Sequence, residues 1–302
     1  MAVTFAVVGP GRAGRALAAE LQRSGWRLVG VLGRNPRRTA QAAAQLQPEG
    51  QAQLLTEWSA IRRAAQVVFL ATPDAQLARV AHELASDQDR EGSIHGAGPV
   101  VLHLSGATPS TVLAPLRDLG CAVGALHPLQ TLADPGATLR GITWGVEGDV
   151  EAVAWADRVV QLLNGTALPV EAAAKPLYHA AAAVASNYLA VLIDLAAELL
   201  AAAGIPRQQG VRALLPLIQG AVANVQRLGL PAALTGPVER GDLPTVQTHL
   251  VAFSDYGVRP QLVALYRLLG IEAVRLALEK GSIDRDTARV LAECLTGHGS
   301  ET

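Results

Sequence analysis

The stretch 5–21, FAVVGPGRAGRALAAEL, decides the fold of the first half of this chain. An apolar run leads directly into Gly9-Pro10-Gly11-Arg12-Ala13-Gly14, and alanines and leucines at helical spacing follow. A G-x-G-x-x-G turn between a strand and a helix is typical of dinucleotide sites. Its glycines permit a tight bend, close approach of a pyrophosphate and packing of helix on strand. The helix N-terminus adds N–H donors for the phosphates, so we expect this whole turn to bind the cofactor.

Short β-rich runs alternate with helical runs around this turn, which is typical of a parallel sheet with crossover helices. The expected strands cover 2–8, 27–32, 52–55, 66–71, 99–104, 121–126 and 142–147. The expected helices cover 12–24, 36–47, 75–85, 109–118 and 149–163. The pattern predicts an α/β fold, a doubly wound, Rossmann-like parallel sheet, as a dinucleotide-binding domain over residues 1–168.

The second half of the chain is expected to be an all-helical substrate and dimerisation domain over residues 169–302. Its predicted helices cover 175–203, 207–228, 242–254, 258–279 and 284–296. The first of them is roughly 28 residues long and nearly apolar, well above the usual length, and needs cover on most sides. We therefore expect a homodimer. Asn187, Asp194 and Glu198 interrupt the apolar run, so we expect no membrane span.

The composition excludes several classes of function. Hydrophobic residues make up 50% of the 302 residues, the formal net charge is −1, and no Lys/Arg block stands out. A nucleic-acid partner is therefore not expected. The 2 cysteines cannot form a disulfide framework, which favours a cytoplasmic location. The first residues are expected to form a strand instead of a signal peptide, and no cluster of side chains has the spacing of metal ligands.

The end of the second expected strand indicates which dinucleotide binds. An NAD site normally offers an Asp or Glu there to the ribose 2′-hydroxyl. This chain instead has LGRNPRR, with Arg34, Arg37 and Arg38 and no acid. Because a guanidinium pairs well with a 2′-phosphate, we predict NADP(H), with Arg34 as the main contact. Arg37 and Arg38 can equally be solvated helix surface.

Three further strand ends carry candidate contacts. The sequence FLATPD places Ala71, Thr72 and Pro73 beyond one strand, where open α/β sheets bind ligands. We expect these residues to border the nicotinamide, and we interpret Asp74 as a helix cap. The other two ends carry Ser105, Gly106 and His127. The Ser105–Gly106 segment can offer a hydroxyl and N–H groups to a substrate carboxylate, or it can serve as a helix cap region. His127 is either catalytic or a structural histidine.

The helix that starts in KPLYHAAAAVASNY carries the remaining candidates. Lys175 and His179 share one helix face, and Asn187 lies on its flank. A buried lysine has a lowered pKa and can donate a proton to a carbonyl oxygen as hydride arrives, whereas an exposed lysine would have no such role. Farther on, Arg240 is either a clamp for a substrate carboxylate or part of a salt bridge to a partner subunit.

With these motifs on the page, the chain resembles bacterial proteins that join a Rossmann-like domain to a domain catalogued as domain of unknown function 2520. The resemblance rests on GPGRAG, LSGATP, HPLQT, YHAAAAVASNY and LTGPVERGD. It implies a helical domain similar to the C-terminal domain of 6-phosphogluconate dehydrogenase. Ketopantoate reductases have Lys-x-x-x-Asn where this chain has Lys175-x-x-x-His179, so the lysine carries over and the asparagine does not. Prephenate dehydrogenases have a Ser and a His-Pro that Ser105 and His127-Pro128 match.

Three functions follow from these residues as hypotheses. The leading one is an NADPH-dependent reductase of a small 2-oxo acid. In this hypothesis ketopantoate is the expected substrate, and Lys175 or His179 is the proton donor. The second is an oxidative reaction on a cyclohexadienyl acid with His127 as the base. The third is an NADP(H)-binding protein without turnover. The first two hypotheses involve a small acidic substrate and the third involves no substrate. None of the three involves a metal.

Overall fold

The computed structural model of this protein describes residues 1–47, 54–86, 98–132 and 137–297. The chain divides into two compact units, Met1–Ser186 and Asn187–Thr302, and each is described by itself. The predicted domain boundary at 168–169 stays a prediction, because compactness places the division later along the chain.

The described part of the first unit contains a seven-stranded sheet in the order β2-β1-β3-β4-β5-β6-β7. The strands are β1 (Thr4–Val8), β2 (Arg27–Leu32), β3 (Val67–Leu70), β4 (Val100–His103), β5 (Val123–Pro128), β6 (Thr143–Gly148) and β7 (Thr166–Pro169). Neighbours from β2 to β5 are parallel, β6 runs antiparallel to β5, and β7 is parallel to β6. The predicted Rossmann-like α/β sheet is therefore confirmed.

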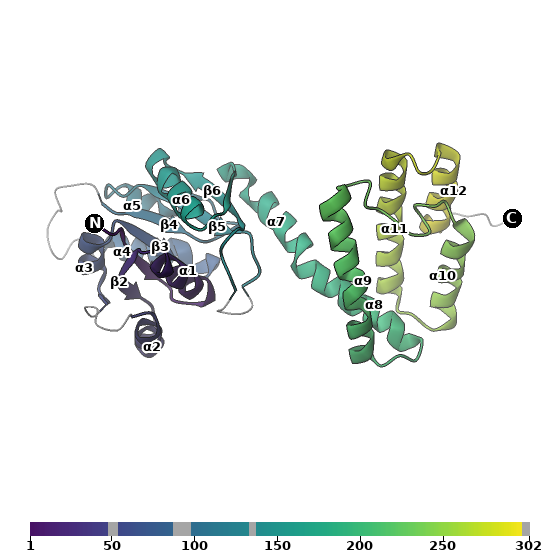
Figure 1. The fold of residues 1–302 in the computed structure, drawn as a ribbon, viewed down its shortest axis with the longest axis horizontal. Coiled ribbons are helices and arrows are strands. Elements are labelled where there is room, and N and C mark those ends of the chain that lie inside the picture. The colour runs from purple at the N-terminus through teal and green to yellow at the C-terminus, as the bar shows by residue number, and fades with distance from the viewer. Residues whose placement is uncertain (48–53, 87–97, 133–136, 298–302) are drawn as a thin grey trace. The chain divides into compact units, whose positions relative to one another are not determined.

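The central strands are almost wholly apolar because helices cover both faces of the sheet. One face packs against α1 (Arg12–Arg23) and α6 (Val150–Leu162), and the other packs against α3 (Trp58–Ala64), α4 (Leu77–Ser86) and α5 (Ala114–Arg117). Helix α2 (Pro36–Leu46) follows β2, and Figure 1 shows the helices around the sheet. Of the expected strand 52–55, residues 52–53 lie outside the described residues, and Leu55 forms an isolated bridge with Gly30.

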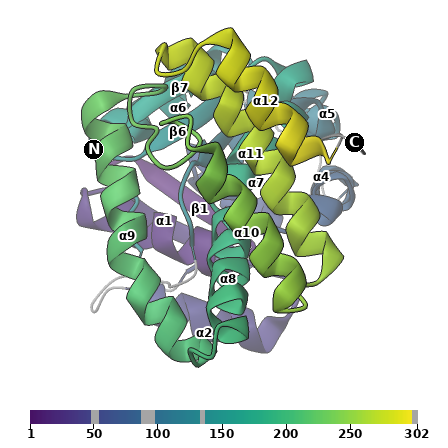
Figure 2. The ribbon, with the colours of Figure 1, turned by 90° about the vertical axis from the view of Figure 1, so that its right-hand side faces the viewer.

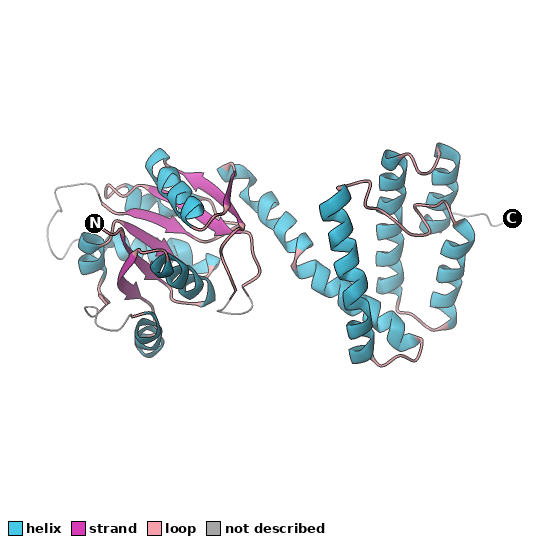
Figure 3. Cartoon of the chain, in the orientation of Figure 1, coloured by secondary structure: helices cyan, strands magenta, loops and turns pink. Residues whose placement is uncertain are grey.

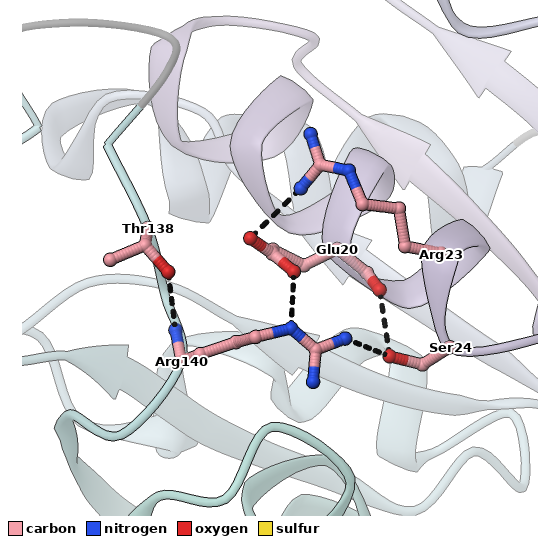
Figure 4. A network of polar contacts seen from close by, with 5 residues as sticks. All are labelled: Glu20, Arg23, Ser24, Thr138 and Arg140. Carbon is pink, nitrogen blue, oxygen red and sulfur yellow. Dashed lines mark hydrogen bonds and ion pairs between the residues drawn. The ribbon is translucent and has the colours of Figure 1, made fainter.

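An ion-pair network ties the segment after β5 to the end of α1 (Figure 4). The Nε atom of Arg140 lies 2.9 Å from Oε2 of Glu20, and its Nη2 donates to Ser24 Oγ at 2.7 Å. Glu20 is buried and also pairs with Arg23 at 2.9 Å. A buried carboxylate requires such partners. The network therefore holds the segment around Arg140, just before β6, against the first helix.

The second unit is helical over its described residues, and the strands of Figure 3 all belong to the first unit. Its helices are α8 (Asn187–Ala202), α9 (Arg207–Leu228), α10 (Leu243–Asp255), α11 (Pro260–Lys280) and α12 (Arg285–Thr296). Helices α8 and α9 pack together, and α11 packs on α12 (Figure 2). A small apolar cluster that includes Val246, Leu291 and Leu295 forms the core.

The single helix predicted over 175–203 is wrong in one respect, since it is interrupted at Ser186. Helix α7 (Lys175–Ala185) ends there, and α8 begins at Asn187. At Ser186 the backbone φ is −118°, far from the usual helical value, while ψ is −64°. Its hydroxyl donates to the Ala182 carbonyl at 3.0 Å, a back-bond that often bends helices. Helix α7 therefore belongs to the first unit and α8 to the second.

Candidate functional site

The glycine-rich turn links β1 to α1 as predicted. Gly9 has a φ of +86°, and a Cβ there would lie 2.8 Å from the Thr72 side chain and 2.9 Å from the Ala71 backbone. A Cβ on Gly14 would lie 2.8 Å from the Gly9 carbonyl oxygen, so the helix approaches the turn closely. Gly11, by contrast, is exposed, and a Cβ there would have its nearest neighbour, the Gly9 carbonyl oxygen, 4.0 Å away. The turn therefore leaves its outer face open to a ligand.

A cavity of about 810 Å³ lies beside this turn, at the carboxyl ends of β1, β2 and β3. This size is within the range of cofactor sites. The predicted cofactor residues that line it are Gly9, Pro10, Gly11, Arg34, Ala71, Thr72 and Pro73. The turn residues Arg12, Ala13 and Gly14 do not line it. Thr72 Oγ1 is buried and has no hydrogen-bond partner among the described residues, so this wall of the cavity can still bind a polar group.

Two of the three arginines after β2 line the cavity, namely Arg34 and Arg38, and Arg37 does not. Asn35 orients this segment, because its side chain accepts a hydrogen bond from the Arg38 backbone N–H at 3.0 Å and caps α2. The sequence leaves Arg38 open as solvated helix surface, whereas the structure places it in the cavity lining. The Asn-Pro pair before it, which predicts a helix start at the end of β2, is the sequence signal that could have indicated this place.

The second group of polar residues surrounds the turn Ser105–Gly106, just beyond β4. Lys175 is only 1% exposed, and its Nζ donates to the Ser105 carbonyl oxygen at 3.0 Å. The Ser105 N–H donates to Nδ1 of His103 at 3.1 Å, and Ser105 Oγ accepts from the Thr108 N–H at 3.0 Å. The N–H groups of Gly106 and Ala107 have no acceptor among the described residues. The turn is thus held from behind, with two donors left over.

The charge of Lys175 is balanced by carboxylates. Burial lowers the pKa of the Lys175 ammonium, while Glu147 and Asp74 oppose that shift. Both oxygens of Glu147 accept hydrogen bonds from Ser110, from its N–H and from its hydroxyl, which fixes the carboxylate in place. Asp74 is the first residue inside a short 3-10 helix, and the N-cap position before it is occupied by Pro73. The interpretation of Asp74 as a cap is therefore wrong, and its charge acts on Lys175 and His127 instead.

Two histidines converge on the other side of Gly106. A Cβ on this glycine would lie 2.5 Å from Nδ1 of His179 and 2.8 Å from Nε2 of His127. The ring centroids of the two histidines are 5.8 Å apart. His127 is half-buried, whereas His179 is exposed. Burial, together with the charges of His179 and Lys175, lowers the pKa of His127 to about 4, so this imidazole is neutral at neutral pH.

The first unit thus brings together five predicted site residues. Ser105 and Gly106 follow β4, His127 lies near the end of β5, and Lys175 and His179 lie at the start of α7. The predicted substrate contacts Asn187 and Arg240 belong to the second unit, and their role stays a prediction. Arg240 is exposed and lies near Asp242 and Glu239, whose pKa values its charge helps to lower.

Three residues that contact or act electrostatically on these side chains were not predicted from the sequence, namely His103, Glu147 and Tyr178. His103 sits inside an apolar strand, where alternation gives no functional signal. Glu147 lies on β6, distant in sequence from Lys175. Tyr178, between the two predicted catalytic positions 175 and 179, was the easiest to find, because it occupies the same helix turn.

The sheet, turn and cavity of the first unit define a Rossmann-like domain, and residues 2–128 match the family model of that name. Residues 142–273 match the family described as Domain of unknown function (DUF2520). The chain therefore matches, in two successive segments, the two family models that the sequence resemblance named. No curated protein matches the sequence.

Several solved structures share the fold. A protein of Thermotoga maritima is 21% identical, with a TM-score of 0.71 over 91% of this chain and 99% of that one. A candidate NADP oxidoreductase from Bacteroides fragilis is 22% identical, with a TM-score of 0.67 over 90% and 98% of the two chains. A reductive aminase from Aspergillus terreus, solved with NADPH and ethyl levulinate, is 18% identical, with a TM-score of 0.61 over 99% and 100%.

Proposed function

We propose that this protein is an NADP(H)-dependent oxidoreductase that reduces a small 2-oxo acid of the ketopantoate type. The observation that carries the proposal is the order of features along one sheet edge. The cavity lies at the ends of β2, β1 and β3, and the Lys175 cluster lies at the ends of the adjacent strands β4 and β5. Open α/β sheets bind dinucleotides along this edge, so the reactive end of the cofactor would approach the cluster.

The residues of the cavity fit NADP(H). The Gly9–Gly11 turn can receive a pyrophosphate, Arg34 and Arg38 can pair with a 2′-phosphate, and Thr72 Oγ1 can bond a ribose or phosphate oxygen. When bound, the nicotinamide supplies or accepts hydride. The NADPH and NADP complexes named among the structures of the same fold add support.

The three arginines provide a matched test of the cofactor. We expect Arg34→Gln and Arg38→Gln each to weaken NADPH binding by about 10–100-fold, which corresponds to one charge-assisted hydrogen bond. NADH binding should change little, because NADH has no 2′-phosphate. Arg37→Gln removes the same charge from the same segment outside the cavity lining and is the control. Equal losses for all three variants, or equal affinity of the native protein for NADPH and NADH, would contradict the assignment.

The Ser105–Gly106 turn is suited to an anionic or carbonyl oxygen. The Ser105 carbonyl and the Gly106 N–H belong to one peptide group, so the bond from Lys175 polarises that peptide and strengthens its N–H as a donor. The adjacent Ala107 N–H adds a second donor, as in backbone anion sites. A substrate carboxylate or carbonyl oxygen would therefore bind at the outer face of Gly106, beside His127 and His179.

In this reaction hydride adds to the carbonyl carbon and a proton adds to its oxygen. Lys175 is buried and already donates to Ser105, which favours exposed His179 as the proton donor. General acid assistance is typically worth about 10²–10⁴-fold. We therefore expect His179→Gln to lower kcat by such a factor, and Lys175→Met to lower kcat while also weakening substrate binding.

The substrate test is a panel of 2-oxo acids with NADPH, followed by nicotinamide absorbance. The panel includes the same acids with ammonia and a cyclic imino acid, because a reductive aminase, an imine reductase and pyrroline-5-carboxylate reductases share the fold. Oxidation of NADPH by 2-oxo acids alone supports the proposal. Turnover that requires an amine or an imine would replace the carbonyl by a C=N group, and no turnover with tight NADPH binding would favour a binding protein.

We also propose that the protein is a cytoplasmic homodimer. Among the described residues, 172–202 is the one helical stretch long and apolar enough to cross a membrane by length and composition, and it is mostly uncovered in the monomer. Exposed Tyr188, Val191, Leu217 and Val222 on α8 and α9 offer apolar area to a second copy. A light-scattering mass near twice 31.4 kDa is expected. A monomeric mass would refute the dimer, and binding to lipid vesicles would refute the cytoplasmic location.

A further inference from the structure

Tyr178 packs between His127 and strand β6. Its hydroxyl lies 2.9 Å from Nδ1 of His127, and the two rings meet edge to face with centroids 5.5 Å apart. Gly145 stands opposite His127 in the antiparallel register of β5 and β6. A Cβ at Gly145 would lie only 2.5 Å from the Tyr178 hydroxyl oxygen, so the absence of a side chain there makes room for the phenol.

The direction of the hydrogen bond to His127 follows from what each group can donate. A phenol has one proton to donate, and Nδ1 of His127 is the acceptor that the described residues place within reach of the Tyr178 hydroxyl, at 2.9 Å. If Nδ1 were the donor, the proton of this part-buried phenol would have no acceptor among the described residues, which costs free energy. The Tyr178 hydroxyl therefore donates to Nδ1 of His127.

This arrangement decides which nitrogen of His127 carries the proton. A neutral imidazole has one N–H donor and one acceptor, and the partner of one nitrogen sets the state of the other. With Nδ1 accepting from Tyr178, the proton of the ring is at Nε2. That atom lies beside Gly106, where Nδ1 of His179 also arrives.

We propose that Tyr178 is a positioning residue that holds His127 in the Nε2–H form, so that a neutral imidazole donates a hydrogen bond at Gly106. The group it binds is then an acceptor, a carbonyl or carboxylate oxygen of the substrate. His127 in this form has no lone pair toward the site and does not act as a general base there. The inference deepens the proposed function and argues against the oxidative reading, in which His127 takes the proton.

The test is the tautomer itself, read by nitrogen NMR of ¹⁵N-histidine-labelled protein at neutral pH without substrate. The 7 histidines include His127, which His127→Gln assigns. We expect native His127 to show a protonated Nε2 and an unprotonated Nδ1. Tyr178→Phe removes one oxygen and should shift His127 toward a mixture of tautomers. An Nδ1–H form in the native protein, or a spectrum unchanged by Tyr178→Phe, overturns the proposal.

The second unit offers a matched control. Tyr266 makes the same kind of bond, with its hydroxyl 2.8 Å from Nδ1 of His249. Tyr266→Phe should alter the His249 signals and leave those of His127 unchanged. If Tyr178→Phe does not fold, the native spectrum alone still decides the tautomer.

Kinetics separates this inference from the proposed function. With an active substrate, Tyr178→Phe should lower kcat by about 2-fold or more, because roughly half or more of His127 then presents the wrong nitrogen. Absence of turnover with any substrate defeats the reductase proposal and leaves the tautomer result standing. Turnover in native protein with full activity in Tyr178→Phe defeats the positioning role alone.

Discussion

Acidification should destabilise the first unit through His103, a buried histidine behind the Ser105–Gly106 turn. The side chain of His103 is 0% exposed, and burial, followed by the charge of Lys175, lowers its pKa to about 3. An unfolded chain has a histidine pKa of about 6.5. Below that value the unfolded state takes up a proton that the folded state refuses, so stability falls as the pH decreases toward the folded pKa.

The magnitude follows from the two pKa values. A pH of about 5 is roughly 1.5 units below the pKa of the histidine in the unfolded chain. Each unit corresponds to about 1.36 kcal/mol of stability. His103 alone should therefore cost about 2 kcal/mol between about pH 7.5 and pH 5. His127, with a folded pKa of about 4, adds to the loss in the same window.

The assay is urea unfolding followed by tryptophan fluorescence, which reports on this unit because all 4 tryptophans lie in it, namely Trp26, Trp58, Trp144 and Trp155. The comparison is His103→Asn, whose side-chain oxygen can accept from the Ser105 N–H but cannot titrate. Any packing cost of this variant is present at both pH values and cancels. Native protein should lose about 2 kcal/mol more than the variant on acidification. Equal losses would refute the reasoning.

Three further predictions concern the frame of the fold. Gly9→Ala should cost about 1–3 kcal/mol in thermal unfolding, because an alanine at φ +86° is strained and its Cβ meets the Ala71 backbone; an unchanged melting temperature would contradict this. Arg140→Met should cost about 1 kcal/mol in urea unfolding by removing one partner of buried Glu20, and no change would show that Arg23 suffices. Asp242→Ala should cost about 1 kcal/mol, seen by far-UV circular dichroism, since its carboxylate caps α10.

The cofactor-binding part of the site could be predicted from the sequence because the residues that form it lie close together in the chain. The G-x-G-x-x-G turn and Arg34 each lie within a few residues of a strand end, and strand ends of a parallel sheet share one edge. The same logic predicted Ser105 and His127 at strand ends on one sheet edge, and in the structure His127 lies beside Gly106, the residue after Ser105.

The remaining features depend on contacts between distant segments. Strand β7 escaped prediction because it is short and mostly exposed at the sheet edge, without a buried alternation. Glu147 reaches Lys175 only because β6 reverses direction beside β5. The interruption at Ser186 has no proline or glycine to announce it, and the apolar run continues through it.

The pairing of a bare strand position with an aromatic ring has an evolutionary consequence. The Tyr178 side chain occupies the space that a side chain at position 145 would need, so a larger residue at 145 requires a smaller one at 178. Across the proteins that join these two families, a larger residue at the position of Gly145 should coincide with loss of the tyrosine. Covariation of these two alignment columns, without comparable coupling between Gly145 and its sequence neighbours, would be the trace of that shared space.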